Sequence, residues 1–377
     1  MKVRLGDYIQ EYSVKNKDDE NISVYSVTNT KGFCKDYFGK EVASKDKTTY
    51  KIVPYGYFAY NPSRINVGSV DWQRKEKKVI VSPLYNVFSV SPNLERQYLY
   101  YYLKSDFVLQ RIKAVATGSV RDNLKLSMLY EFPIELPKLE NQRKIVKILD
   151  KVSDVVEKKE QELEQLDTFV KSRFAEMFGD PIRNPKGWKV VTIGDIVTEV
   201  RYGTSKPAVE GGKYPYLRMN NLTADGHLDL NDLKYIDISD DEVEKCVVRK
   251  GDVLFNRTNS IDLVGKTAVF DLPDDMVIAG YIIRVRLNEK ILPEVLSQYM
   301  NLEALKDILR SMAKGAVNQA NINAQELQSI RIYVPDIELQ KQFVEMKDQV
   351  DKSKSKIQKS LEETQLLFDS LMQKYFG

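Results

Sequence analysis

The side chains that most enzymes use for chemistry are scarce in this sequence. It contains one histidine, His227, and two cysteines, Cys34 and Cys246, among 377 residues. A lone imidazole excludes most histidine-based acid–base schemes, and two distant thiols form no zinc-ligand cluster. Neither GxxxxGK[ST] nor GxGxxG, the glycine-rich loops that hold phosphates and dinucleotides, occurs. We therefore expect a non-catalytic chain with no metal and no cofactor of its own.

Three stretches come close to a chemical motif and depart from it in detail. Asn61-Pro62 begins like the NPP-aromatic motif of amino-methyltransferases, but Ser63 and Arg64 follow. Lys266-Thr267 follows a glycine but lacks the earlier glycine of a phosphate loop. The aspartates from Asp225 to Asp241 lack the spacing of a calcium loop, so a solvated loop is expected there.

What remains is a set of basic, amide and aromatic side chains in loop-like stretches. Arginine and asparagine can hydrogen-bond base edges in pairs, whereas lysine mostly meets phosphate. Residues 257–260 are the best candidates, because they follow the apolar strand DVLF as a polar tip between strands. The Gly-x-Val elements at 118–120 and 315–317, followed by Asn123 and Asn321, could place backbone N–H groups on a phosphate. Taken singly, each candidate is also compatible with an ordinary surface role. The predicted DNA-binding residues are Lys31, Lys35, Lys45, Lys47, Asn61, Arg64, Arg74, Lys75, Lys77, Arg121, Asn123, Arg201, Tyr202, Lys206, Arg218, Asn220, Asn221, Arg257, Thr258, Asn259, Lys266, Lys314, Asn318 and Asn321.

An internal repeat must position these residues. The run from Phe132 to Gly179 aligns without a gap on the run from Ile330 to Gly377, at an offset of 198 residues. Gln142 falls on Gln340 in this alignment. The match continues through the preceding segments, so that Asn123 lies opposite Asn321. A repeat of this length predicts two similar structural units in tandem.

Each copy of the run predicts one long helix, preceded by a proline and ended by a glycine. About 40 residues at 1.5 Å each would make a rod of roughly 60 Å. Apolar residues recur in steps of three and four, and so long a stripe favours pairing with the other copy. Two helices that each pack on their own globular neighbour are the alternative. The predicted helix-pairing residues are Ile145, Leu149, Val152, Val156, Leu163, Leu166, Val350, Ile357, Leu361 and Phe368. Lys159 interrupts the first stripe, where the second continues with an isoleucine.

The rest of the chain predicts two mixed, mostly β globular parts, so the fold class is α+β. Tyrosine-rich and β-branched runs predict strands, and residues 94–116 and 293–313 predict a helix in each part. The predicted organisation is a globular domain 1–137, a helix 138–179, a globular domain 180–335 and a helix 336–377. The first globular part carries net charge +6 and the second −2. No apolar run reaches the ~18 residues of a membrane span, and the beginning of the chain has no signal-peptide pattern, so a cytoplasmic location is expected.

With these features in view, the sequence resembles the specificity (S) subunit of type I restriction–modification systems over essentially its whole length. The stretches that carry the resemblance are LPKLENQRKIVKIL and VPDIELQKQFVEM at the helix starts, MFGDPIRNPKGWKVVTIGDI between the repeats, YKIVPYGYFAYNPSRINVGSV in the first globular part, and KYPYLRMNNL and GDVLFNRTNSIDLVGKTAV in the second.

The resemblance implies that each globular part is a target recognition domain reading one half of a split site in double-stranded DNA. The long helices would form an antiparallel coiled coil that spaces the two domains and docks two methyltransferase (M) subunits. S-adenosylmethionine would be bound by those subunits, and restriction (R) motor/nuclease subunits would complete the nuclease. From the residues alone, a coiled-coil scaffold with two protein- or glycan-binding domains is the alternative, and a co-purifying methyltransferase would discriminate the two.

Overall fold

The computed structural model describes residues 2–35, 46–116, 123–316 and 319–377. The chain forms two compact units. Unit 1 comprises Met1–Glu160 and Gln358–Gly377, and unit 2 comprises Gln161–Ile357. Helix and strand are mixed in both units, which confirms the predicted α+β class.

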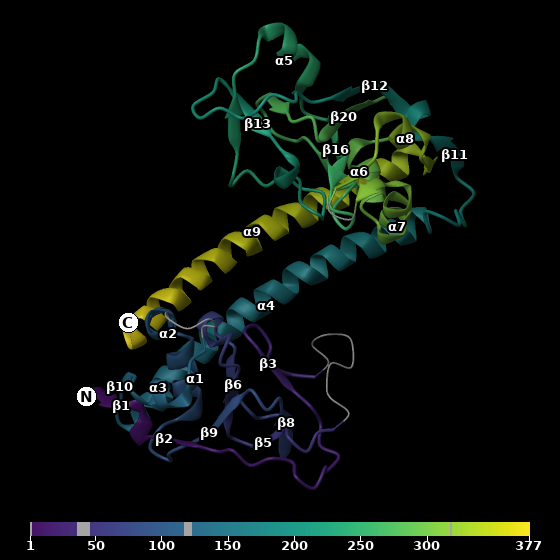
Figure 1. Ribbon diagram of the computed structural model, residues 1–377. Coiled ribbons are helices and arrows are strands. Elements are labelled where there is room, and N and C mark those ends of the chain that lie inside the picture. The colour runs from purple at the N-terminus through teal and green to yellow at the C-terminus, as the bar shows by residue number, and fades with distance from the viewer. Residues whose placement is uncertain (1, 36–45, 117–122, 317–318) are drawn as a thin grey trace. The chain divides into compact units, whose positions relative to one another are not determined.

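Two 40-residue helices, α4 (Leu139–Phe178) and α9 (Ile337–Phe376), are the longest elements (Figure 1). Their first residues and their last residues are each 198 apart, so the repeat seen in the sequence is also a repeat of structure. Gly179 ends α4 at φ +87°, a left-handed conformation that favours glycine, and its N–H donates to Ala175 O at 2.8 Å. The boundary between the units divides both helices, α4 after Glu160 and α9 after Ile357.

Each unit contains a four-stranded antiparallel sheet with the same strand order. In unit 1 the order is β2 (Ile9–Glu11), β9 (Asn86–Val90), β6 (Phe58–Tyr60), β7 (Val70–Trp72). In unit 2 it is β12 (Val197–Tyr202), β20 (Ile282–Leu287), β16 (Val253–Asn256), β18 (Thr267–Val269). The central strands are rich in β-branched and aromatic residues, which suits a buried pleated surface.

Smaller sheets complete both units. In unit 1, three pairs form: β1 (Lys2–Arg4) with β10 (Pro133–Glu135), β3 (Ser26–Thr28) with β4 (Gly32–Cys34), and β5 (Lys51–Pro54) with β8 (Lys78–Val81). In unit 2, β11 (Lys189–Thr192) pairs with β23 (Arg331–Val334), and a second sheet has the order β14 (Lys234–Ile236), β13 (Tyr214–Leu217), β19 (Met276–Ile278), β15 (Val247–Val248). A third sheet has the order β17 (Thr258–Asn259), β22 (Gln319–Asn321), β21 (Lys314–Ala316).

Short helices pack on the sheets, and two predictions about them were wrong. The single helix expected over 94–116 is two helices, α1 (Arg96–Lys104) and α2 (Asp106–Ala116). Ser105 between them is extended, and its hydroxyl donates to Tyr102 O at 2.8 Å, an alternative that serine offers to a helical backbone. The helix expected over 293–313 is likewise α6 (Pro293–Met300) and α7 (Glu303–Met312). The other short helices are α3 (Leu126–Tyr130), α5 (Asp240–Cys246) and α8 (Ala324–Ser329), and the 3-10 turns are η1 (Leu5–Asp7), η2 (Ile65–Val67), η3 (Ile193–Ile196) and η4 (Met219–Asn221).

The long helices pair within each unit, and each half also joins its unit's core. In unit 2, the Phe343 ring of α9 lies 5.4 Å from Phe178 of α4, and Lys354 meets Asp167. Along this contact the number on α9 rises as the number on α4 falls, so the helices run antiparallel. In unit 1, Lys159 donates a hydrogen bond to Ser360 of α9, which places this lysine in the helix seam.

The predicted pairing residues lie along the inner stripe of the two helices. Leu149 and Val350 are buried, and the other eight are half-buried. Leu149 and Phe376 share one core with Tyr98 of α1, whose ring is 5.0 Å from that of Phe376. The helices therefore pair with each other and also pack on their globular neighbours. The sequence analysis treated these two arrangements as alternatives, but the structure combines them. Within the described residues, no helix is long and apolar enough to cross a membrane.

Candidate nucleic-acid interface

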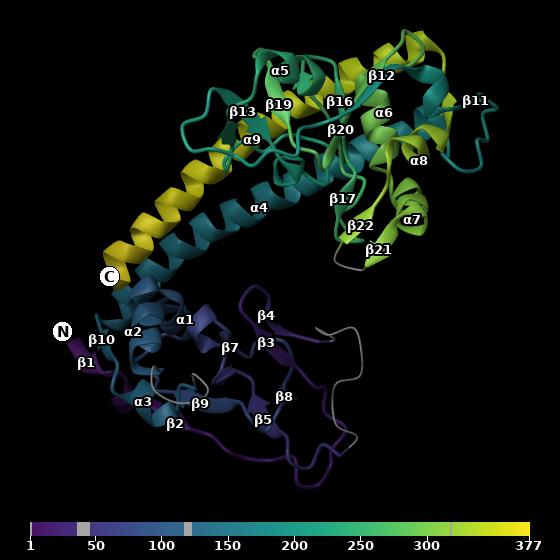
Figure 2. The same ribbon diagram turned by 45° about the horizontal axis from the view of Figure 1, so that its top comes forward.

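A polar tip in unit 2 joins three segments that are far apart in the sequence. Strand β17 follows the buried strand β16 and pairs with β22, so that Thr258 lies opposite Asn321 (Figure 2). Asn321 Nδ2 donates to Thr258 Oγ1 at 3.1 Å. Tyr202 ends β12, and its hydroxyl accepts from Ala324 N at 2.8 Å. We call Tyr202, Arg257–Asn259 and Asn321 the unit 2 tip; all were predicted from the sequence, and the fold brings them together.

Arg257 is the centre of the unit 2 tip. Its Nη2 donates to Asn321 Oδ1 at 3.0 Å, and its Nη1 donates to Gly280 O at 3.4 Å. The guanidinium carbon lies 5.0 Å from the centroid of the Tyr202 ring, within the range of a cation–π contact. Three contacts from three strands and turns thus fix the plane of the guanidinium.

Unit 1 has a tip at the equivalent place. Leu124 N donates to Pro62 O at 3.1 Å, and Ile322 N donates to Arg257 O at 2.9 Å in unit 2. Leu124 and Ile322 are 198 residues apart, so the same backbone hydrogen bond joins the same two segments in both units. In unit 1 it brings Asn61–Arg64 beside Asn123. Asn61 Oδ1 accepts from the Ser63 hydroxyl at 2.9 Å, while Arg64 and Asn123 are exposed.

A second basic area of unit 1 lies around the loop between β7 and β8. Asp71 is buried, which raises its pKa, and it accepts from Phe33 N at 3.0 Å and from Arg74 Nη1 at 3.1 Å. These bonds hold the β3–β4 hairpin against the loop. Lys35 on the hairpin pairs with Glu76 at 2.7 Å. The loop also carries Lys75 and Lys77, the turn of the hairpin carries Lys31, and Lys47 is half-buried elsewhere in unit 1.

Most predicted cations of unit 2 are neutralised by a nearby carboxylate. The pairs are Arg201–Glu199 at 3.0 Å, Lys206–Glu242 at 2.5 Å, Arg218–Asp232 at 2.5 Å and Lys314–Glu326 at 2.5 Å. One side chain of each pair is more than half exposed, so the pairs contribute little to stability, but each lowers the charge that the surface presents. Asn220 is exposed and available for a contact.

Three predicted DNA-binding side chains lie in the interior and are corrected here. Lys266 is 8% exposed, its ammonium donates to the carbonyls of Met219 and Leu222, and burial lowers its pKa. Asn221 is 1% exposed and accepts from Arg218 N at 2.8 Å, which caps η4. Thr258 is also buried and can only position its neighbours. Their polar atoms make hydrogen bonds in the interior, where polar groups need a partner. Lys45, Arg121 and Asn318 lie outside the described residues.

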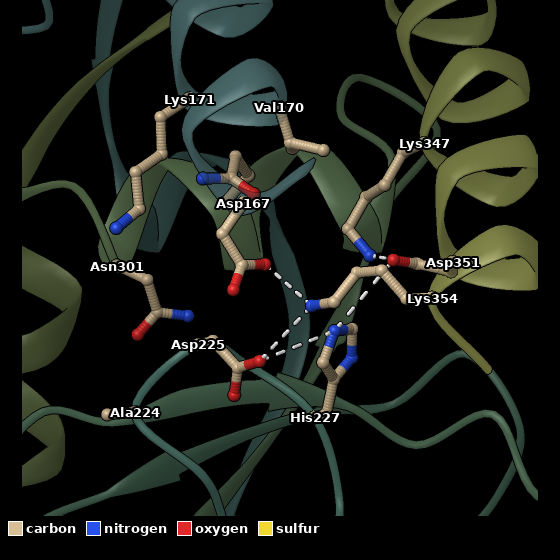
Figure 3. A pocket seen from close by; sticks show the side chains of 11 residues that line it. Asp167, Val170, Lys171, Ala224, Asp225, His227, Asn301, Lys347, Asp351 and Lys354 are labelled. Atoms are coloured by element: carbon tan, nitrogen blue, oxygen red, sulfur yellow. Dashed lines mark hydrogen bonds and ion pairs between the residues drawn. The ribbon is translucent and has the colours of Figure 1, made fainter. Parts of the chain in front are cut away.

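The sequence analysis missed two features of unit 2. Tyr281 is 50% exposed, and its carbonyl accepts from Arg257 N at 3.0 Å, so it borders the unit 2 tip. A charged cluster also forms where the loop after η4 meets both long helices (Figure 3). Lys354 Nζ lies 2.6 Å from Asp167 Oδ1 and 3.6 Å from Asp225 Oδ2. His227 Nε2 lies 3.7 Å from the same Asp225 carboxylate.

The prediction of a purely solvated aspartate loop is therefore wrong for Asp225, which lies beside Lys354 and His227. Burial opposes ionisation of this carboxyl, but its hydrogen bond from Thr223 and the charges of His227 and Lys354 lower its pKa overall. No sequence signal marked this cluster, because its members come from α4, α9 and a loop with no local motif. In the described part of the chain, no group of three or more histidine, cysteine or acidic side chains is placed to hold a metal ion.

Comparisons of the sequence with known proteins agree on one family. The model of the type I restriction modification DNA specificity domain matches residues 3–168 and again residues 185–364. The type I restriction enzyme EcoKI specificity subunit of Escherichia coli is 23% identical over 299 residues, which cover 74% of this chain and 64% of that protein. The putative type I restriction enzyme MjaX specificity subunit of Methanocaldococcus jannaschii is 30% identical over 196 residues, covering 51% and 46%. The chain thus spans less than two thirds of the length of these relatives.

Solved structures agree on the fold. The S subunit of a type I restriction–modification system from M. genitalium aligns with a TM-score of 0.59 at 15% identity, covering 100% of this chain and 96% of that one. A chain from a structure concerned with complex assembly and conformational transition of the type I R-M system aligns with a TM-score of 0.58 at 20% identity, covering 100% and 97%.

Proposed function

Because the chain belongs to the family of the type I restriction modification DNA specificity domain, we propose that it is the sequence-specific DNA-binding subunit of a type I restriction–modification complex. The globular part of each unit reads one half of a bipartite target. The chain itself is non-catalytic and acts in the cytoplasm, and chemistry belongs to its partners.

The observation that carries this proposal is the duplicated tip. The same backbone hydrogen bond mounts a polar loop beside an asparagine-bearing segment in both units, while the side chains displayed there differ. Pro62 and Arg64 occupy the unit 1 loop, whereas Arg257 and Asn259 occupy the unit 2 loop. The same backbone arrangement with different polar side chains suits two domains that recognise different base sequences, because base edges carry the sequence information.

The paired helices are the spacer and the docking surface in this proposal. Each long helix has one half in unit 1 and the other half in unit 2, so both link the two readers. Two methyltransferase (M) subunits dock on them and bind S-adenosylmethionine, and restriction (R) subunits add the motor and nuclease. Since several unit 2 cations are paired with carboxylates, the partner subunits supply much of the attraction to phosphate.

Mapping of N6-methyladenine in cells that express this chain with its methyltransferase partner tests the proposal. Exchanging residues 180–335 for those of another family member should change one half-site and leave the other half-site and the unspecified gap unchanged. Exchanging residues 1–137 is the matched control, which should change only the other half-site. Methylation that ignores both exchanges, or that occurs equally without this chain, would refute a DNA-reading role.

A further inference from the structure

Arg257 differs electrostatically from the exposed or half-buried cations of unit 2 that were predicted to bind DNA, a group that leaves out the buried Lys266. Arg201, Arg218 and Lys314 each have a carboxylate within 3.0 Å. Among the described residues, Arg257 has no carboxylate partner within 4 Å, and its side-chain hydrogen bonds go to an amide and a backbone carbonyl. Its Nε is buried without a hydrogen-bond partner in the described part of the chain. The tip thus holds a half-buried positive charge that the free protein leaves uncompensated.

The surroundings of this charge are neutral and oriented. Asn259 Nδ2 donates to Asn256 Oδ1 at 2.9 Å, and Asn256 Nδ2 donates to Tyr281 O at 3.2 Å. These bonds fix the amides beside Arg257. The Tyr202 ring covers one face of the guanidinium, and Asn321 holds one terminal nitrogen. An arginine whose guanidinium is already held in one plane loses little side-chain conformational entropy when it makes two parallel hydrogen bonds.

We propose that Arg257 is a specificity-determining residue that reads a guanine in the half-site bound by unit 2, with Tyr202 and Asn321 as positioning residues. Each terminal nitrogen has a second N–H beyond the one it already donates, and the two terminal nitrogens of a guanidinium can donate together to the O6 and N7 acceptors of guanine. The neutral amides favour a base edge over a phosphate, which is usually met by exposed, mobile cations. This inference rests on the proposed function and narrows it to one base type at one position.

Selection from a randomised DNA library tests the inference, with the full-length chain in complex with its methyltransferase partner. The wild-type complex should enrich two half-sites, and the one that changes on exchange of residues 180–335 should contain a guanine. Arg257→Gln should lose the preference at that guanine by about 5- to 150-fold, equivalent to about 1–3 kcal/mol. All other positions, including the whole other half-site, should keep their preferences.

Two further variants separate base reading from phosphate binding and from misfolding. Arg257→Lys keeps the charge but lacks the rigid planar fork that Tyr202 and Asn321 hold in place, so it should weaken the same base preference. Arg249→Gln removes an equal charge from a surface ion pair with Glu244 and Asp275, and should leave the selected sequence unchanged.

The outcomes discriminate clearly. Uniformly weaker binding of Arg257→Gln, with unchanged base preferences and a salt dependence smaller by about one charge, would make Arg257 a phosphate contact and overturn the guanine assignment. A unit 2 half-site without guanine would overturn it while leaving the proposed function intact. A wild-type complex that selects no sequence would refute the proposed function itself.

Discussion

Gln340 anchors the start of α9, and its removal should destabilise unit 2 strongly. The side chain is fully buried. Its Oε1 accepts from Leu292 N, at the N-cap of α6, at 2.8 Å. Its Nε2 donates to Lys290 O at 3.0 Å and to Pro335 O at 2.8 Å. Gln340→Ala would remove this partner from the Leu292 N–H and from the carbonyls of Lys290 and Pro335, of which Pro335 is buried, Leu292 half-buried and Lys290 exposed.

The repeat predicts the same loss in unit 1. Gln142 is also fully buried, and it accepts from Glu95 N at 2.8 Å at the N-cap of α1. It donates to Asn93 O at 3.0 Å and to Pro137 O at 2.9 Å. An unpaired buried polar group costs about 1–3 kcal/mol, and water entering the vacated space offsets part of that. Because the three backbone groups are only partly buried in most cases, the low end of this range applies to each, and the loss is about 2–3 kcal/mol for each substitution, which is large for a single residue.

The two tryptophans allow each unit to be followed by itself. Trp72 lies in unit 1 and Trp188 in unit 2, and the chain has only these two. Urea unfolding monitored by fluorescence in single-tryptophan backgrounds should show Gln142→Ala lowering the unit 1 transition and Gln340→Ala lowering the unit 2 transition. Gln365→Ala and Gln349→Ala, at exposed sites of α9 in units 1 and 2, are the matched controls and should change stability by less than about 0.5 kcal/mol. A loss below 1 kcal/mol for either buried glutamine would refute the anchoring argument.

Two further predictions concern charges in unit 2. Lys354→Val should lower the free energy of unfolding by about 1–2 kcal/mol, because it leaves Asp167 and Asp225 without their cation. This loss is smaller than that for a fully buried ion pair, because both carboxylates are partly exposed. Adding Asp167→Gln should recover part of that loss in the same urea assay, because it removes one of the two carboxylates, and no recovery would contradict the pairing. Burial lowers the pKa of Lys306 to about 8 from its ordinary 10.5, so between these values the unfolded chain binds more protons and stability should rise with pH. The free energy of unfolding of the wild type minus that of Lys306→Met should therefore increase from pH 8 to pH 10, and a flat difference would exclude the effect.

Much of the architecture could be predicted because it repeats. The 198-residue offset located both long helices to within two residues, since proline, glycine and a 3.6-residue stripe are local signals. The break of helix 94–116 at Ser105 could not be predicted, because serine is compatible with a helix and only the tertiary packing selects the extended conformation. The interior position of Lys266 was missed for a related reason: its partners are the carbonyls of Met219 and Leu222, which no sequence pattern links to it. The unit 2 tip could be predicted because polar residues directly after an apolar strand lie at a sheet edge.

The repeat makes the two helix seams comparable, and their polar residues differ. At the repeat offset, Lys354 and Asp167 of the unit 2 seam correspond to the half-buried Val156 and the exposed Gln365 of unit 1. If α4 paired with α4 of a second copy in the same antiparallel register, Asp167 would face Val156 and lose its cation. If α9 paired with α9, Lys354 would face Gln365 and lose its anion. Pairing of α4 with α9 is the arrangement that satisfies both charges, because an unpaired half-buried charge costs more than the pair contributes. The difference between the seams thus favours pairing of α4 with α9 over pairing of either helix with a copy of itself. A polar seam residue sets the register of a coiled coil in the same way.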